Sequence, residues 1–261
     1  MMTPKSDSHL VLIPSYNPGP KVFETVHSAR QYWNPVWVVV DGSSDGTDIE
    51  LQALADRDDG LQVIILPDNQ GKGAAVLAGA KAAQEAGYTH ILTMDSDGQH
   101  PAQFIPQFMA VSQANPDAMV LGHPIFDASA PSIRVNGRRI SNMWARIETF
   151  GAGIADSLFG FRIYPIKPLV QVMTGSRWMR RFDFDPEVLV RLSWSGVRAI
   201  NQPAPVRYFN REEGGVSHFN YVRDNFLLTF MHIRLVLGFL MRLPLRVWRL
   251  VRRGRLRSSH R

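Results

Sequence analysis

The chain of 261 residues contains no cysteine, and this absence excludes several kinds of site. Without thiols there is no disulfide framework, no zinc–thiolate centre and no cysteine nucleophile. A secretory signal is also lacking, because the first apolar run, residues 10–13, is short and ends at Pro14. We therefore expect the protein to stay in the cytoplasm.

Acidic residues are missing from the last part of the chain, residues 225–261, which holds nine arginines. Subtracting these nine charges from the net charge of +6 leaves −3 on residues 1–224. A nucleic-acid-binding domain carries its basic residues where it binds, so we expect no nucleic-acid partner for the body. A basic tail after an apolar stretch indicates an anionic membrane surface instead.

The tail itself has two parts. Residues 226–241 are apolar but interrupted by His232 and Arg234, so this run looks too short and too charged to predict a membrane span. Beyond Pro244, apolar residues recur every third position among arginines. This pattern is typical of a helix that lies in the membrane interface, although packing of the same helix on the body is the alternative.

The rest of the chain alternates short, branched apolar runs with longer helical stretches. The apolar runs predict strands at residues 9–13, 36–40, 63–66, 90–94 and 119–122. The intervening stretches predict helices near residues 20–32, 47–57, 72–86 and 103–114. Strands of consecutive apolar residues separated by helices indicate an α/β fold, with a mostly parallel sheet covered by helices on both faces. Ligands bind such sheets beyond the carboxyl ends of the strands.

Two acids follow the predicted strand 90–94 directly. Carboxylates at Asp95 and Asp97 can face one hard cation, and Mg²⁺ is commonly held by one or two carboxylates together with substrate phosphate. The alternative is a solvated turn, since Asp, Ser and Gly favour turns. Placement at a strand end favours the metal site, where the cation would neutralise charge on a departing nucleotide diphosphate.

Two further polar loops follow predicted strands. The loop from Asp41 to Thr47 has calcium-like spacing, but Gln52 stands where a bidentate Glu is needed, so it is better suited to bind a base or ribose, or to cap the next helix. The segment from Asn69 to Gly73 opens a predicted helix, whose amides and dipole attract anions. Lys72 is either a phosphate ligand or a solvated cap.

A family resemblance rests on four ordered motifs: Pro14-Ser-Tyr-Asn17, Asp41 to Thr47, Asn69-Gln-Gly-Lys-Gly73 and Asp95-Ser-Asp-Gly-Gln-His100. Together they resemble the family 2 glycosyltransferases, which have the Rossmann-like GT-A fold. Gln99-His100, Phe159-Gly-Phe-Arg162 and Phe182-Asp-Phe-Asp-Pro-Glu187 more narrowly resemble the polyprenyl-phosphate mannose synthase branch. The resemblance covers about residues 9–220.

The resemblance implies a donor site for a UDP or GDP sugar and a bound Mg²⁺ or Mn²⁺. The expected metal ligands are Asp95, Asp97 and Gln99. The expected donor-binding residues are Pro14, Ser15, Tyr16, Asp41, Ser43, Lys72, Asp95 and Ser96. We expect residues 1–220 to form the GT-A domain, with 1–123 binding the donor, 124–220 binding the acceptor, and 221–261 forming basic amphipathic helices.

The family transfers sugar with inversion, in one in-line displacement. A phosphate acceptor needs no strong base, because its second ionisation lies near pH 6. A hydroxyl acceptor needs a carboxylate within hydrogen-bond reach. Asp156 is our candidate for that catalytic base, beside Asp95 and Asp97; Asp183, Asp185 and Glu187 are alternatives, of which the first two could instead cap a helix. Phe159 stands where lipid-phosphate enzymes tend to have serine, which leaves the acceptor open.

Cations after the metal motif suit a phosphate-bearing acceptor through charge-assisted hydrogen bonds. The expected acceptor-binding residues are Arg139, Arg162, Arg211 and His218. Arg139 could instead lie on the wet face of a helix whose apolar stripe is Ile140, Trp144 and Ile147. The Gly-rich segment 211–218 is suited to act as a lid.

These expectations describe a metal-dependent hexosyltransferase bound peripherally to the cytoplasmic face of a membrane. Its acceptor would be a membrane lipid, such as polyprenyl phosphate, or a hydroxyl of a glycolipid or other lipid intermediate. A catalytically silent membrane-associated binding protein is the alternative from another class, and intact Asp95 and Asp97 argue against it.

Overall fold

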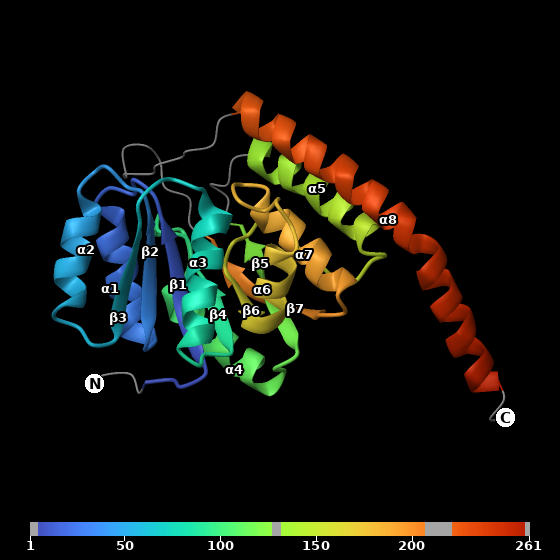
Figure 1. Ribbon diagram of the computed structural model, residues 1–261, viewed down its shortest axis with the longest axis horizontal. Helices are drawn as coiled ribbons and strands as arrows, with labels where there is room; N and C mark the ends of the chain where they lie inside the picture. Colours follow the sequence, from blue (N-terminus) through green and yellow to red (C-terminus); the bar gives the residue numbers. More distant parts are fainter. Residues whose placement is uncertain (1–4, 127–131, 207–220, 259–261) are drawn as a thin grey trace.

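The computed structural model describes residues 5–126, 132–206 and 221–258 (Figure 1). Within them one sheet has seven strands in the order β3-β2-β1-β4-β6-β5-β7. The strands are β1 His9–Ser15, β2 Val36–Asp41, β3 Leu61–Leu66, β4 His90–Thr93, β5 Ala118–Ile125, β6 Arg162–Pro165 and β7 Arg198–Pro205. All pairings are parallel except those of β6, which runs antiparallel to β4 and β5. The mostly parallel sheet predicted from the sequence is confirmed.

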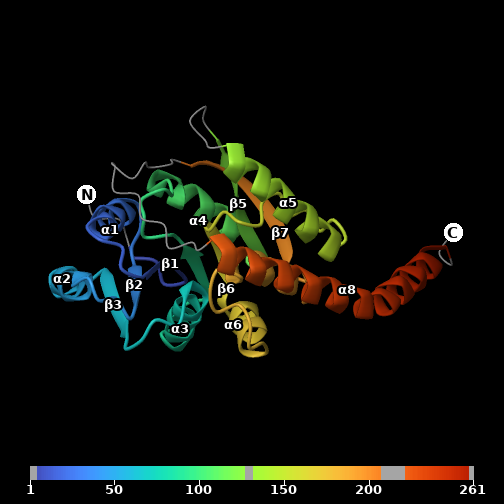
Figure 2. The same cartoon turned by 90° about the horizontal axis from the view of Figure 1, so that it is seen from above.

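Helices cover both faces of this sheet. The helices are α1 Lys21–Tyr32, α2 Thr47–Ala55, α3 Lys72–Glu85, α4 Ile105–Ala114 (preceded by a 3-10 turn, Ala102–Phe104), α5 Ser132–Glu148, α6 Ile166–Thr174, α7 Phe184–Trp194 and α8 Tyr221–Ser258. In Figure 2, α3 and α6 lie on one side of the strands, and α1 and α4 lie on the other.

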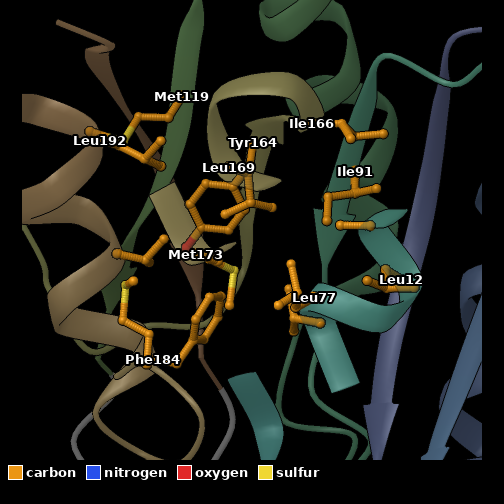
Figure 3. Packing of buried hydrophobic residues seen from close by; sticks show 14 of the residues in the cluster. Leu12, Leu77, Ile91, Met119, Tyr164, Ile166, Leu169, Met173, Phe184 and Leu192 are labelled. Carbon is orange, nitrogen blue, oxygen red and sulfur yellow. The ribbon is translucent and has the colours of Figure 1, made fainter. Parts of the chain in front are cut away.

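The strands are buried on both sides, so their alternate residues build two cores. Leu10 and Leu12 of β1 join the core beneath α3, α6 and α7, while Val11 and Ile13 join the core beneath α1 and α4. Figure 3 shows the first core, where Tyr164 of β6 lies among side chains from α6. Continuous burial explains why these strands read as unbroken apolar runs.

All five predicted strands are present, but β6 and β7 were not predicted. β6 has only four residues, one of them arginine and one proline. β7 is an edge strand with the polar sequence RAINQPAP and is mostly not buried. Neither segment therefore shows the apolar pattern that a sequence reading detects.

α5 and α8 lie outside the layers that cover the sheet (Figure 1). Buried Ala145 of α5, Val190 of α7, and Met231 and Leu235 of α8 form a separate small core. The tail was expected to form more than one helix, but its described part is a single helix of 38 residues. Among the described residues, one segment, Phe226–Leu243, is long and apolar enough by length and composition to cross a membrane, which corrects the sequence estimate.

Candidate functional site

Three polar loops meet at one edge of the sheet because the parallel strands β1, β2 and β4 end there. β1 pairs with both β2 and β4, so the residues that follow each strand lie side by side. Ser15 closes β1, Asp41 closes β2, and Asp95 follows β4 by two residues. The site therefore lies beyond the carboxyl ends of the strands, as the sequence predicted.

Lys72 is the centre of the charge arrangement. It is the first residue of α3, and its Nζ lies 2.7 Å from Oδ1 of Asp95 and 2.8 Å from Oδ2 of Asp185 in the first turn of α7. Burial would lower the pKa of Lys72, but the two carboxylates raise it above its usual value. Burial would likewise raise the pKa of Asp95, yet Lys72 and then His100 lower it to about 2. Both groups are therefore charged at neutral pH.

Gly160 lies directly over this ion pair. A Cβ at this position would come within 2.9 Å of Lys72 Nζ and 3.0 Å of Asp95 Oδ2. Only glycine allows the backbone to approach the pair so closely without displacing a charged group. This gives a physical role to the glycine of the Phe159-Gly-Phe-Arg162 motif.

His100 fixes the backbone of the metal motif. The amide of Asp95 donates to His100 Nδ1 over 2.9 Å, so this nitrogen is the acceptor of a neutral ring and the proton is on Nε2, which lies 3.6 Å from Asp95 Oδ2. Burial lowers the pKa of His100 to about 4. The ring stands edge-on to Phe159, with centroids 4.9 Å apart. His100 thus contacts Asp95 at both its amide and its carboxylate.

Asp97 is the second carboxylate of the motif. Burial and then the neighbouring charge of Asp95 raise its pKa to about 6. The backbone amide of Gln99 donates to Asp97 Oδ1 over 3.0 Å. No cluster of three or more His, Cys, Asp or Glu side chains suited to a metal occurs in the described part of the chain. Two adjacent carboxylates nevertheless fit a cation that is also held by the phosphates of a ligand.

Backbone amides at the start of α3 donate hydrogen bonds to acceptors elsewhere in the protein. Asp41 accepts hydrogen bonds from the amides of Gln70 at 2.9 Å and Gly71 at 2.7 Å. The amide of Ala74 donates to the carbonyl of Arg180 over 3.1 Å. The amides of Gln70, Gly71 and Ala74 therefore already have acceptors within the protein, and Lys72 adds a cationic side chain at this end of the helix. A donor contact by Asp41 stays a prediction.

The first two loops are joined to each other. Ser43 Oγ accepts from the amide of Asn17 over 3.0 Å, and Asp45 accepts from the amide of Gly19 over 3.1 Å. Tyr16 is exposed at this edge, whereas Pro14 is buried. Ser15 Oγ is buried and has no hydrogen-bond partner in the described part of the protein, so it is available to a ligand. The carbonyl of Ser96 accepts from Thr25 Oγ1 at 3.2 Å.

Asp156 is occupied by protein groups. Arg138 Nη1 and Asn142 Nδ2 donate to its carboxylate over 2.6 and 3.2 Å, and the amides of Leu158 and Phe159 donate over 2.9 and 2.7 Å. Both carboxylate oxygens of Asp156 therefore already accept hydrogen bonds from protein groups. This geometry argues against our sequence-based choice of Asp156 as the base and gives it a role in shaping the loop that leads to Gly160.

The alternative bases also have partners. Asp183 accepts from the amides of Met179 at 2.9 Å and Arg181 at 3.0 Å, so it closes the loop before α7 and makes no side-chain cap to the helix. Glu187 is fully buried and pairs with Arg191 at 2.7 Å and with Arg234 of α8. Its pKa is raised by burial, against the effect of the two arginines.

The expected acceptor residues do not form one group. Arg162 is fully buried; its Nη1 donates to the carbonyl of Asp185 over 2.6 Å and to Tyr164 Oη over 3.1 Å. Its Nε and Nη2 have no hydrogen-bond partner within the residues described. Arg139 is exposed on α5. Arg211 and His218 lie outside the described residues, as does the predicted lid.

Comparison with known proteins adds two curated relatives. The chain is 29% identical over 217 residues to a polyprenol monophosphomannose synthase of Mycolicibacterium smegmatis, covering 78% of each protein. It is 27% identical over 221 residues to an undecaprenyl-phosphate mannosyltransferase of Micrococcus luteus, covering 78% of this chain and 85% of the relative.

The fold is similar to solved structures of glucosyl-3-phosphoglycerate synthase from Mycobacterium tuberculosis. A complex with Mn²⁺, UDP and glucosyl-3-phosphoglycerate superimposes with a TM-score of 0.61 at 15% identity, covering 90% of this chain and 80% of the other. The sequence profile described as glycosyl transferase family 2 matches residues 10–189, which include every loop of the site described above. The chain belongs to glycosyl transferase family 2.

Proposed function

We propose that this protein moves a hexose from a UDP or GDP sugar to a polyprenyl phosphate, with inversion at the anomeric carbon. The observation that carries the proposal is the partly buried Lys72–Asp95 ion pair beside Asp97 at the end of β4. This arrangement offers a cation and an acidic pair where a sugar diphosphate and its metal need them. The names of the two curated relatives support a lipid-phosphate acceptor.

The residues present fit Mg²⁺ or Mn²⁺, with Asp95, Asp97 and Gln99 as the proposed ligands. When bound, the metal would neutralise charge that develops on the departing nucleotide diphosphate. A complex of the M. tuberculosis synthase contains Mn²⁺ together with UDP-glucose, which supports this cofactor class. Lys72 supplies a further positive charge, and the hydrogen bond from the Asp95 amide to His100 Nδ1 holds Asp95 in place.

The bond that forms joins an oxygen of the acceptor phosphate to the anomeric carbon, and the bond that breaks joins that carbon to the nucleotide diphosphate. A phosphate dianion needs no proton acceptor to attack. This suits a site in which Asp156 is saturated with hydrogen bonds and Asp185 is paired with Lys72. The same observation makes a hydroxyl acceptor, which requires a free carboxylate, the second choice.

We further propose that the protein works on the cytoplasmic face of a membrane. The acid-free, arginine-rich end of the chain supports this placement, because clustered arginines attract anionic lipid.

A direct test incubates the full chain with radiolabelled UDP and GDP sugars, Mn²⁺ or Mg²⁺, and detergent-solubilised polyprenyl phosphate. We expect one donor to yield a labelled lipid, and Asp97→Asn to abolish the product while leaving the folded structure intact. Absence of both transfer and donor hydrolysis across all UDP and GDP sugars tested would contradict the proposal.

A further inference from the structure

The outer side of α8 is apolar and exposed. Phe226, Ile233, Leu237 and Met241 are 72%, 55%, 57% and 74% exposed, and they recur at intervals of seven and four residues. This spacing places them on one side of the helix. Water therefore contacts a continuous apolar stripe, which is costly unless another apolar phase covers it.

α5 carries a second stripe of the same kind. Ile140, Met143 and Ile147 are 60%, 50% and 44% exposed, and Phe150 follows just beyond the helix end. Ser141, Ala145 and Glu148 instead face the body and are buried. Of the stripe named in the sequence analysis as an alternative, Ile140 and Ile147 are exposed and Trp144 is partly buried.

The two helices lie side by side, as both views show (Figures 1 and 2). Ala145 of α5 packs in one small core with Met231 and Leu235 of α8, and the rings of Phe150 and Phe239 are 4.5 Å apart. Their outer residues form what we call the α5–α8 surface: Ile140, Met143, Ile147, Phe150, Phe226, Phe230, Ile233, Leu237, Leu240 and Met241.

The polar residues that interrupt the apolar stretch of α8 point inward. His232 Nδ1 lies 2.8 Å from Glu148 Oε1, and Arg234 pairs with the buried Glu187 of α7 and lies over the Trp178 ring at 3.8 Å. These contacts hold α8 lengthwise against the body. The apolar side is left facing out, so the helix is arranged to lie on an apolar phase rather than to leave the body and cross it.

Both helices are also connected to the catalytic edge. On α7, Asp185 faces Lys72 while Glu187 faces Arg234 of α8. On α5, Arg138 binds Asp156, which holds the loop leading to Gly160 above Lys72. The α5–α8 surface is therefore connected to the proposed donor site through α7 and through the loop before Gly160.

We propose that the α5–α8 surface docks the protein onto an anionic bilayer, with apolar side chains of both helices entering the interface. The inference rests on the proposed function, since a lipid acceptor requires the site to lie at a membrane. Its new element is α5, which the sequence assigned only to acceptor binding. Apart from the inward-facing Arg234, the arginines of the acid-free residues 225–261 complement anionic headgroups and would repel the same segment of a second copy.

The test measures partitioning of the full chain onto vesicles of phosphatidylcholine with one third phosphatidylglycerol, by flotation. We expect Ile140→Gln with Ile147→Gln to weaken partitioning at least about tenfold, equivalent to about 1.4 kcal/mol. Ile233→Gln with Leu237→Gln should weaken it similarly. Ile49→Gln, at an isoleucine of α2 that is more exposed than these, is the control and should bind as the wild type does.

Two results would overturn the proposal. In one, the α5 variant binds vesicles like the wild type while the α8 variant does not, which would leave docking to α8 alone. In the other, sedimentation shows a dimer that both variants dissociate, which would make the surface a protein interface.

Transfer to detergent-solubilised polyprenyl phosphate separates this inference from the proposed function. We expect the α5 variant to keep wild-type transfer in detergent and to lose transfer only to acceptor in vesicles. If the variants lose vesicle binding but the wild type transfers sugar to no lipid phosphate, the docking surface is upheld and the proposed acceptor is refuted.

Discussion

Lys72 receives its counter-charges from residues that are distant in sequence, since Asp95 follows β4 and Asp185 lies 113 residues away in α7. Removing the ammonium would leave two carboxylates facing each other in a partly buried place. Loss of one partner from a buried charge group is strongly destabilising.

We expect Lys72→Met to lower the free energy of unfolding by about 3 kcal/mol, and to lower kcat/KM for the sugar nucleotide by about 100-fold. Urea denaturation and steady-state kinetics measure the two effects. Lys72→Met with Asp185→Asn should recover much of the stability but not the activity. Wild-type kinetics in the Lys72→Met protein would show that Lys72 is only a structural counter-ion.

His100 makes a separate prediction, because the Asp95 amide needs an acceptor. His100→Phe keeps an aromatic ring but leaves that amide buried and unsatisfied, at a cost of about 1–3 kcal/mol. His100→Asn offers a side-chain oxygen close to the position of Nδ1 and should retain more stability and more activity. Thermal unfolding and kcat/KM compare the two; equal losses in both variants would contradict a role through the amide.

Local features of the site could be predicted from the sequence, but its pairings could not. Asp95 and Asp97 were placed correctly because they directly follow an apolar run that becomes β4. The saturation of Asp156 depends on Arg138 and Asn142 of α5, which the local sequence around Asp156 does not reveal. Charged residues gain or lose chemical function through such partners, so residue type alone suggested a base where the structure has a loop anchor.

Helix α8 is attached to the body by a buried carboxylate of another helix. Glu187 of α7 binds Arg191 of its own helix and Arg234 of α8. We expect Glu187→Gln to weaken docking of α8, because the arginine keeps its charge and loses the carboxylate. Hydrogen exchange should rise in α8 and stay unchanged in β1 to β4. Unchanged exchange in α8 would mean that apolar contacts alone hold it.

Strands could be predicted from the sequence where burial on both faces requires an unbroken run of apolar residues. β1 and β2 are buried throughout and were found by their apolar runs, whereas β7 is a polar edge strand and was missed. The sequence showed that Ile140, Trp144 and Ile147 share a side of one helix, but in the fold the two isoleucines are exposed and Trp144 is partly buried. A helical period shows which residues share a side; it does not show whether that side meets protein, water or lipid.

Two stacked histidines, His9 and His90, lie at the amino-terminal ends of β1 and β4, whereas the site lies beyond the carboxyl ends of these strands. The rings of His9 and His90 are 4.3 Å apart, and burial, then the nearby His90, lower the pKa of His9 from 6.5 to about 4. The unfolded chain therefore takes up a proton at a higher pH than the folded protein does. The contribution of His9 to stability is complete above pH 6.5 and decreases as the pH falls towards 4.

This shift corresponds to a loss on the order of 3 kcal/mol across that pH range. We expect His9→Gln to flatten the dependence between pH 6.5 and 4, even if it lowers stability at pH 7. Urea unfolding at several pH values measures the slope. An equally steep decrease in the variant would assign the acid sensitivity to other groups.

At the scale of the molecule, the donor site and the α5–α8 surface are joined through α7, which contacts Lys72 at one residue and α8 at another. This arrangement fits an enzyme that takes a soluble donor at the edge of its sheet and a lipid acceptor at a surface connected to that edge. The family and the parallel sheet could be predicted from the sequence, while the connection through α7 required the fold.

The most direct test of this account is the chemical nature of the labelled lipid formed from a sugar nucleotide and membrane lipid extract. We predict a product that mild acid hydrolyses to free sugar, as a sugar linked to lipid phosphate would be, with an anomeric configuration opposite to that of the donor. A labelled lipid that withstands mild acid, or one that retains the donor's configuration, would contradict it.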